Sequence, residues 1–243
     1  MNDFTISLIQ IFRNNRNAAD RLRELWDLIP AGTDALLLPE EWHNGDPEES
    51  LRCLDVLSHI CSDKGASAIS GGMPWEEGGR KFLRTWILGY GGEAIAHYDK
   101  THLSSKRGED KIYSPGGGPA IFNIGDATCA ALSGYDLLFP EYCRQVSLAG
   151  ANIFFVSANP NDGFTDIWES VIRSAAFTNQ CFVAACAGFG NSALISPFGE
   201  VMGMMGRDEG VMSFGIKLSD APRCRKNFPL ERDRRGELYV IFP

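Results

Sequence analysis

Apolar runs and amphipathic segments alternate along this 243-residue chain, and glycine-rich turns interrupt that alternation. Residues 4–10 switch between apolar and polar side chains with a period of two, which predicts a strand. Residues 17–29 place their apolar side chains on one helical stripe, and residues 35–38 form the continuous apolar run of a buried strand. Strands that alternate with helices indicate an α/β fold.

The sequence also predicts a β-hairpin. Residues 82–88 and 93–98 flank the turn Gly89-Tyr-Gly-Gly92, which is typical of two antiparallel strands. Hairpins mixed with strand–helix alternation favour two sheets with helices packed outside over one doubly wound parallel sheet. We find no repeat or linker and expect one domain over residues 1–243. Further strands are expected at 66–71, 120–124, 128–132, 152–157, 182–187, 193–196 and 211–217, and further helices at 47–64, 140–149 and 165–180.

Composition excludes several classes of function. The net charge of −8 argues against binding to a nucleic-acid backbone. The seven cysteines include no C-x-x-C pair, and the four histidines form no metal-ligand motif, so we expect reduced, buried thiols and no zinc site. The amino terminus shows no signal peptide, and no apolar stretch is long enough to span a membrane. These features predict a cytoplasmic protein.

Three segments place reactive side chains where a predicted strand ends. Glu40 follows the apolar run 35–38 and so lies at the carboxyl end of a predicted strand, where α/β folds build their sites. Burial there would raise the pKa of its carboxyl group, which suits a general base. Lys100 follows residues 93–98, where a cation can stabilise an oxyanion. The run 128–132 stops at Ser133-Gly134, a strand-to-helix elbow of the kind that displays a nucleophile. Alone, each segment also fits a loop carboxylate, a solvated lysine or a plain turn.

Taken in order, these segments resemble the nitrilase superfamily of carbon–nitrogen hydrolases. Glu40 and Lys100 are 60 residues apart, and Lys100 and Gly134 are 34 apart. The resemblance extends over nearly the whole chain. It rests on residues 7–10, 98–103, 109–116, 134–141, 168–180 with Arg173, 191–200 and 234–239.

The resemblance implies a four-layer αββα sandwich that pairs into a homodimer through its outer helices. It also implies hydrolysis of a small amide, carbamoyl compound or nitrile without a cofactor. Glu40 would be the general base and Lys100 the oxyanion stabiliser. Glu109 would be a second acid that orients Lys100 or the substrate. Plausible substrate-binding residues are Trp42, His43, Tyr135, Asn159 and Trp168, although aromatic residues often serve packing alone.

One position departs from the family pattern. The family's nucleophilic cysteine would stand before Tyr135-Asp136, and this chain has Gly134 there. Because glycine cannot form a thioester, we expect the chain to be inactive or strongly impaired by the usual route. Strand alternation predicts that the neighbouring Ser133 points to the opposite side from the site. An active enzyme that uses Ser133 with a base within reach, or a water activated by Glu40, is a further alternative.

Two interpretations of Gly134 therefore remain open. The chain is either an amidase scaffold without its nucleophile, as an engineered variant or a natural pseudoenzyme, or a non-catalytic ligand-binding or regulatory protein that partners an active paralogue. The other features of the site keep the family pattern, which favours a pocket that still binds a small molecule.

Overall fold

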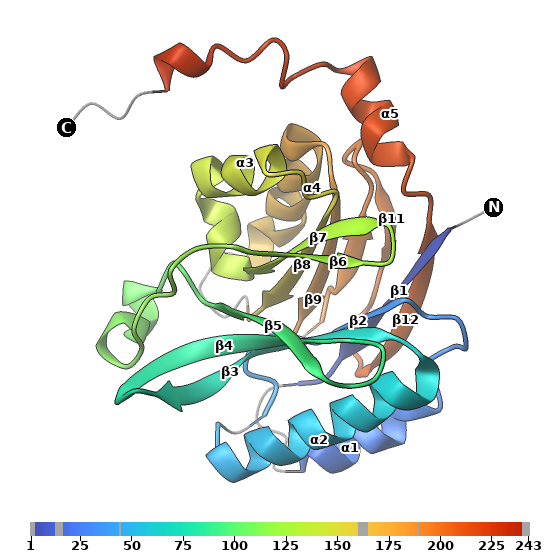
Figure 1. Ribbon diagram of the computed structural model, residues 1–243, viewed down its shortest axis with the longest axis vertical. Helices are drawn as coiled ribbons and strands as arrows, with labels where there is room; N and C mark the ends of the chain where they lie inside the picture. Colours follow the sequence, from blue (N-terminus) through green and yellow to red (C-terminus); the bar gives the residue numbers. More distant parts are fainter. Residues whose placement is uncertain (1–2, 13–16, 44, 160–164, 189, 240–243) are drawn as a thin grey trace.

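The computed structural model describes residues 3–12, 17–43, 45–159, 165–188 and 190–239. Two six-stranded sheets stack face to face, and a pair of helices covers the outer face of each (Figure 1). Helices α1 (Ala18–Trp26) and α2 (Pro47–Lys64) pack on one sheet. Helices α3 (Pro140–Leu148) and α4 (Trp168–Asn179) pack on the other. The predicted αββα sandwich is confirmed.

Each sheet has three parallel strands at its centre. In the first sheet, β1, β2 and β3 run parallel, β12 and β4 flank them antiparallel, and β5 pairs antiparallel with β4 at the edge. In the second, β7, β8 and β9 run parallel between β6 on one side and β10 and β11 on the other. The strands of the first sheet are β12 (Gly210–Ile216), β1 (Phe4–Gln10), β2 (Ala35–Leu37), β3 (Ser67–Glu77), β4 (Arg80–Leu88) and β5 (Ala94–Asp99). Those of the second are β11 (Val201–Met204), β10 (Ala193–Ile195), β9 (Phe182–Ala187), β8 (Ile153–Ala158), β7 (Ala127–Ser133) and β6 (Ala120–Ile124).

Three apolar clusters hold the four layers together. One lies between the sheets and takes residues from both, and the other two lie between each sheet and its helices. Strand alternation divides β7 between two of them, since Cys129 and Ala131 face the other sheet whereas Ala130 and Leu132 face α3 and α4. This division decides which side of β7 faces the candidate site.

The ends of α2 follow directly from the local sequence. The Asp46 side chain accepts a hydrogen bond from the Glu48 amide at 3.1 Å, and Pro47 occupies the first turn. At the other end Gly65 adopts the left-handed conformation, with φ of 60°. Both boundaries match those predicted.

Several elements differ from the predictions. β3 extends to Glu77 rather than ending at residue 71, because a bulge at Ser70-Gly71 lets the strand continue against β4. β11 and helix α5 (Asp220–Asn227) were not predicted. The loop 101–118 contains two 3₁₀ turns, η1 (Ser105–Arg107) and η2 (Glu109–Lys111). Further 3₁₀ turns are η3 (Gly134–Leu138), η4 (Thr165–Ile167), which opens the helix predicted at 165–180, and η5 (Gly236–Leu238).

Membrane insertion finds no support in the helices. Among the described residues, none forms a helix with both the length and the apolar character needed to cross a bilayer.

The inter-sheet core predicts a contrast between two isoleucines of the second sheet. Ile153 of β8 is fully buried between the sheets, whereas Ile121 of β6 is 38% exposed. We expect Ile153→Ala to lower the free energy of unfolding by about 2–5 kcal/mol through a cavity, and Ile121→Ala to cost less than about 1 kcal/mol. Urea unfolding followed by circular dichroism measures both, and equal losses would contradict this assignment of the core.

Candidate active site

Glu40 is held at the end of β2 by a close approach of two chain segments. A Cβ atom at Gly71 of β3 would lie 1.8 Å from the Pro39 carbonyl oxygen, and φ at Gly71 is +74°, so the position needs glycine. Beyond it, the Glu41 amide donates to the Gly72 carbonyl oxygen at 2.7 Å. The Glu40 carboxylate is thereby fixed at the sheet edge, where it is only 3% exposed.

Lys100 lies one residue past β5 and is buried as deeply as a core side chain. Its amide donates to the Leu83 carbonyl oxygen at 2.9 Å, and its own carbonyl accepts from the Gly116 amide at 2.9 Å. The Nζ atom donates to Glu40 Oε1 at 2.9 Å and to Glu109 at 3.0 Å. The structure therefore brings together the three charged residues expected in the site.

Glu109 reaches Lys100 from η2, in the loop after β5. One carboxylate oxygen, Oε2, accepts from the Ser104 amide at 2.8 Å, which fixes its orientation. Arg107, two residues earlier, lies 3.1 Å from Glu109 and 3.5 Å from Glu40, and it also pairs with Glu41. Sequence reasoning missed Arg107 and Glu41, although both stand within two residues of a predicted acid.

Burial and charge act against each other in this cluster. Desolvation raises the pKa of Glu40 to about 7, and the negative charges of Glu109 and Glu41 add to the rise while Lys100 opposes it. For Lys100, burial alone would lower the pKa, but the attraction of Glu40 and Glu109 raises it above its ordinary value. Lys100 is therefore a permanent cation, and Glu40 can exchange a proton near neutral pH.

Ser133 makes a contact that strand alternation did not predict. Its Oγ atom donates to Glu40 Oε2 at 2.8 Å, so the expectation that Ser133 points away from the site is wrong. The physical reason lies in the sides of β7, because Ser133 follows Cys129 and Ala131 on the side that faces the other sheet. Strand alternation correctly predicts that residues 133 and 134 face opposite sides of β7, but the serine, not the glycine, is the one that faces Glu40.

Neighbouring strands repeat the orientation of Ser133. In the parallel register Ser133 pairs with Ser157, and Ser157 pairs with Cys186. The Ser157 hydroxyl donates to the Leu38 carbonyl oxygen at 2.8 Å, and the Cys186 thiol donates to the Ile9 carbonyl oxygen at 3.3 Å. This row of three side chains joins the second sheet to the first where their parallel strands end.

Gly134 faces the other way. A Cβ atom added there would lie 2.8 Å from Ala158 Cβ and 3.5 Å from the Trp168 ring, both of which belong to the core under α3 and α4. Contacts below 3.0 Å require the surroundings to shift. A side chain at position 134 would thus meet packed atoms of the outer core.

A buried aspartate fixes the elbow that carries these two residues. Asp136 accepts hydrogen bonds from the Ser133 amide at 2.8 Å and from the Tyr98 hydroxyl. It also bonds to His102 Nδ1 at 2.7 Å. Because Tyr98 and His102 flank Lys100 in the chain, Asp136 ties the elbow to the segment that carries the lysine.

The remaining predicted residues separate into two groups. Trp42 and Trp168 lie in the apolar clusters, with 0% and 2% exposure, so packing accounts for both. The other three lie around the charged cluster. Lys100 Nζ is 5.8 Å from the centre of the Tyr135 ring, Asn159 Nδ2 is 3.4 Å from Glu41 Oε2, and His43 lines a nearby pocket.

That pocket, of about 390 Å³, adjoins the cluster at Glu109 and Arg107. Its wall also carries Glu41, His43 and Lys81, so both donors and acceptors line it. The Gly45 amide donates to His43 Nδ1 at 3.1 Å, which leaves Nε2 as the ring's N–H. Burial lowers the pKa of His43, and this neutral donor has no hydrogen-bond partner among the described residues.

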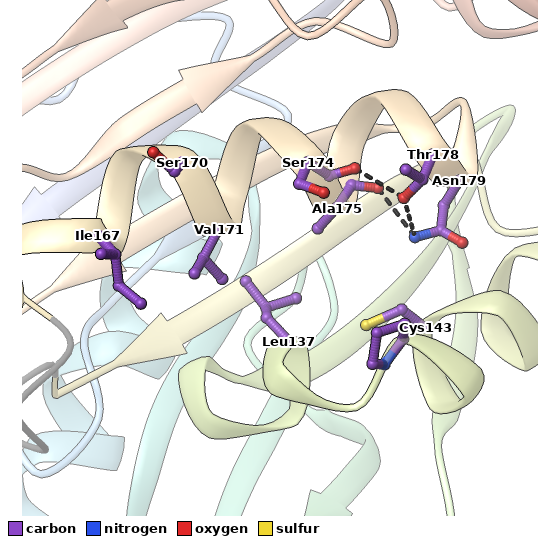
Figure 2. Close-up of a pocket in the computed structure, with 10 residues that line it drawn as sticks. Leu137, Cys143, Ile167, Ser170, Val171, Ser174, Ala175, Thr178 and Asn179 are labelled. Carbon is purple, nitrogen blue, oxygen red and sulfur yellow. Dashed lines mark hydrogen bonds between the residues drawn. The ribbon is translucent and has the colours of Figure 1, made fainter.

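A second hollow, of about 380 Å³, lies outside the site between α3 and α4. Figure 2 shows Leu137 and Cys143 facing Val171 and Ala175 of α4 across it, with Ile167 at one end. None of Glu40, Lys100 and Glu109 lines it. It is therefore a groove of the outer helical layer rather than part of the charged site.

Comparison with known proteins places this chain in a family. Residues 29–226 match the model of the carbon–nitrogen hydrolase family. A 2-oxoglutaramate amidase from Bacillus subtilis is 29% identical over 85% of this chain and 86% of its own length. An omega-amidase from Xenopus tropicalis is 26% identical over 99% of this chain and 98% of its own.

Solved structures share the fold. A CN-hydrolase superfamily protein from Xanthomonas campestris superposes with a TM-score of 0.85 at 23% identity, and each chain is fully covered. An amidase variant from Nesterenkonia gives 0.81 at 22% identity over 98% of this chain and 96% of its own. With the family model matching most of its length, the chain belongs to the carbon–nitrogen hydrolase family.

Proposed function

We propose that this chain recognises the carbon–nitrogen group of a small amide, carbamoyl compound or nitrile at its Glu40–Lys100–Glu109 cluster, without thioester chemistry. The observation that carries the proposal is a fully buried lysine paired with two carboxylates beside an elbow that has no thiol. Burying a charge is costly unless it is paired. Clusters of buried, paired charges with shifted pKa values are typical of catalytic and binding sites, where they can stabilise charge that develops on a substrate.

Each charged residue has a role that its contacts support. The Glu40 carboxylate, with its pKa near 7, can take a proton from an attacking group. Lys100 gives two of its three N–H donors to Glu40 and Glu109, and the third can meet the oxygen of a carbonyl that is gaining charge. Glu109 orients the ammonium and balances its charge.

Small ω-amides are the substrate class that fits the pocket best. Arg107, Lys81 and His43 on its wall offer donors for a distal carboxylate or keto oxygen. Asn159, beside Glu41, has a buried Oδ1 with no hydrogen-bond partner among the described residues, and this oxygen can accept from an amide N–H. The names of relatives that act on 2-oxoglutaramate and other ω-amides agree with this choice.

Hydrolysis by the family's thiol route should be absent or strongly impaired. Gly134 has no nucleophile, and a Cβ atom there would meet Ala158 at 2.8 Å. The absence of a thiol at the elbow also favours a second candidate function, in which the chain binds a ligand without turnover and regulates an active paralogue. The two differ in whether ammonia is ever released from a bound amide.

We further propose a cytoplasmic homodimer. All seven cysteines are free and buried, in keeping with a reducing compartment. The groove between α3 and α4 carries the exposed apolar Ile167 and provides a surface for the outer helices of a second copy (Figure 2). Light scattering on the purified protein should give twice the chain mass of 26.7 kDa, and a monomer at micromolar concentration would refute the dimer.

Amide binding can be tested without turnover. We expect the half-amide of succinic acid to bind the unaltered protein in isothermal titration calorimetry, and Asn159→Ala to weaken that binding by roughly 2- to 10-fold through one lost hydrogen bond. The exposed Asn227→Ala is a matched control that should bind like the parent. Absence of heat with a panel of amides, carbamoyl compounds and nitriles would refute the proposed function.

The base role of Glu40 predicts a pH-dependent stability. Because its pKa is raised from about 4.5 to about 7 in the folded state, the folded protein retains a proton that the unfolded chain releases. The resulting stabilisation is complete below pH 4.5 and is lost as the pH rises through 7. Relative to Glu40→Gln, the parent should therefore lose on the order of 3 kcal/mol across this window. Urea unfolding of both proteins from pH 4.5 to 8 measures it, and a constant difference would contradict the raised pKa.

A further inference from the structure

The Ser133 hydroxyl uses its two hydrogen-bonding capacities in different directions. Its lone pair accepts from the Tyr135 amide at 3.3 Å and so caps η3. Its proton goes to Glu40 Oε2 at 2.8 Å, while Lys100 occupies the other oxygen of the same carboxylate. Capping explains the lone-pair contact, but it does not require a proton aimed at a buried carboxylate.

We propose that Ser133 is the nucleophile of this chain, with Glu40 as its base and Lys100 as the stabiliser of the oxyanion. The inference deepens the proposed function and rests on it, since it names the atom that would attack the bound amide. A nucleophile and its base must lie within about 2.6–3.2 Å, and the Ser133–Glu40 contact meets that condition.

The reaction balances with the residues present and water. The Ser133 Oγ–H proton passes to Glu40 Oε2 as Oγ bonds to the carbonyl carbon, and the carbonyl electron pair moves to the oxygen beside Lys100. The C–N bond then breaks, and the leaving nitrogen takes the proton from Glu40 and departs as ammonia. Water next attacks the ester and gives a proton to Glu40, and Oγ leaves with that proton. The net change is amide plus water to carboxylic acid plus ammonia.

Other candidate nucleophiles are less suited to the position. Ser157, on the same face of the adjacent strand, donates its proton to the Leu38 carbonyl oxygen, which is no base. Burial raises the pKa of the Cys129 thiol to about 12, and that of Cys143 to about 12 as well. Neither thiol contacts Glu40: Cys129 donates to Ala127 and Cys143 to Asp136.

Covalent labelling tests the assignment directly. The protein would be incubated with a biotinylated alkyl fluorophosphonate, which phosphonylates activated serine hydroxyls, and digested for mass spectrometry. We expect the label on Ser133, its loss in Ser133→Ala, and a labelling rate roughly 100-fold lower in Glu40→Gln. Ser157→Ala is the matched control, because it removes the neighbouring hydroxyl of the same row and should leave the label in place. Label on another residue, or none, would overturn the proposal.

Two cysteine variants keep the test decisive if Ser133→Ala folds poorly. Ser133→Cys replaces only the hydroxyl oxygen by sulfur and so puts a thiol beside Glu40 and Lys100, where iodoacetamide should alkylate it quickly. Gly134→Cys faces Ala158 and Trp168, so it should react roughly 100-fold more slowly and unfold at a lower urea concentration, because its side chain overpacks the outer core. The reverse order of reactivity would show that residue 134, not 133, faces the site.

The outcomes separate this inference from the function on which it rests. Calorimetric binding of an amide by a protein that shows no Ser133 label would leave the function standing and refute the nucleophile. A labelled Ser133 in a protein that binds no amide would support the nucleophile and refute the proposed function. Ammonia release that disappears in Ser133→Ala but persists in Ser157→Ala would support both.

Discussion

A lysine ammonium with almost no access to solvent lies where the two sheets meet. Lys100 is among the largest fully buried side chains in the described part of the chain, and removal of such a charge from water costs several kcal/mol. Glu40 and Glu109 offset that cost, and each is itself buried. With Glu41 and Arg107 the cluster holds three carboxylates and two cations, so a proton on Glu40 makes it neutral overall. Loss of one partner would leave an unpaired buried charge, which makes the cluster interdependent.

The cluster also explains why both sheets are needed. Glu40, Lys100 and Glu109 come from the first sheet and its loops, while Ser133 comes from the second. Parallel strands end at this edge in both sheets, and the row of Ser133, Ser157 and Cys186 reaches across it. The same contacts that align the sheets therefore set the geometry between the carboxylate and the hydroxyl.

Local sequence predicted much of the fold because periodicity and capping act over short distances. The boundaries of α2 follow from Asp46-Pro47 and Gly65 alone. The far half of β3 was not predicted, and it contains Pro74, a residue type that argues against a central strand. The structure resolves this conflict, since β2 pairs with β3 only as far as Ile69, and Pro74 lies five residues beyond that pairing. Such information depends on the length of a neighbouring strand, which residue patterns within β3 do not contain.

The site was predicted in its charges but not in the direction of its elbow. The family resemblance placed Glu40, Lys100 and Glu109 together, yet a period of two says only that residues 133 and 134 face opposite ways. Which of them meets Glu40 depends on where the second sheet packs, and that is a tertiary property.

The two adjacent residues of the elbow, Ser133 and Gly134, are consistent with each other once that direction is known. A thiol can ionise by itself near neutral pH, whereas a hydroxyl attacks only with an adjacent base. The residue that faces Glu40 carries a hydroxyl at hydrogen-bonding distance from a carboxylate whose pKa burial raises to about 7. The residue that faces Ala158 has no side chain, in a place where a Cβ atom would be crowded. Glycine at the elbow thus relieves the packing of the outer core, while the serine before it supplies the only hydroxyl that the described residues bring to Glu40.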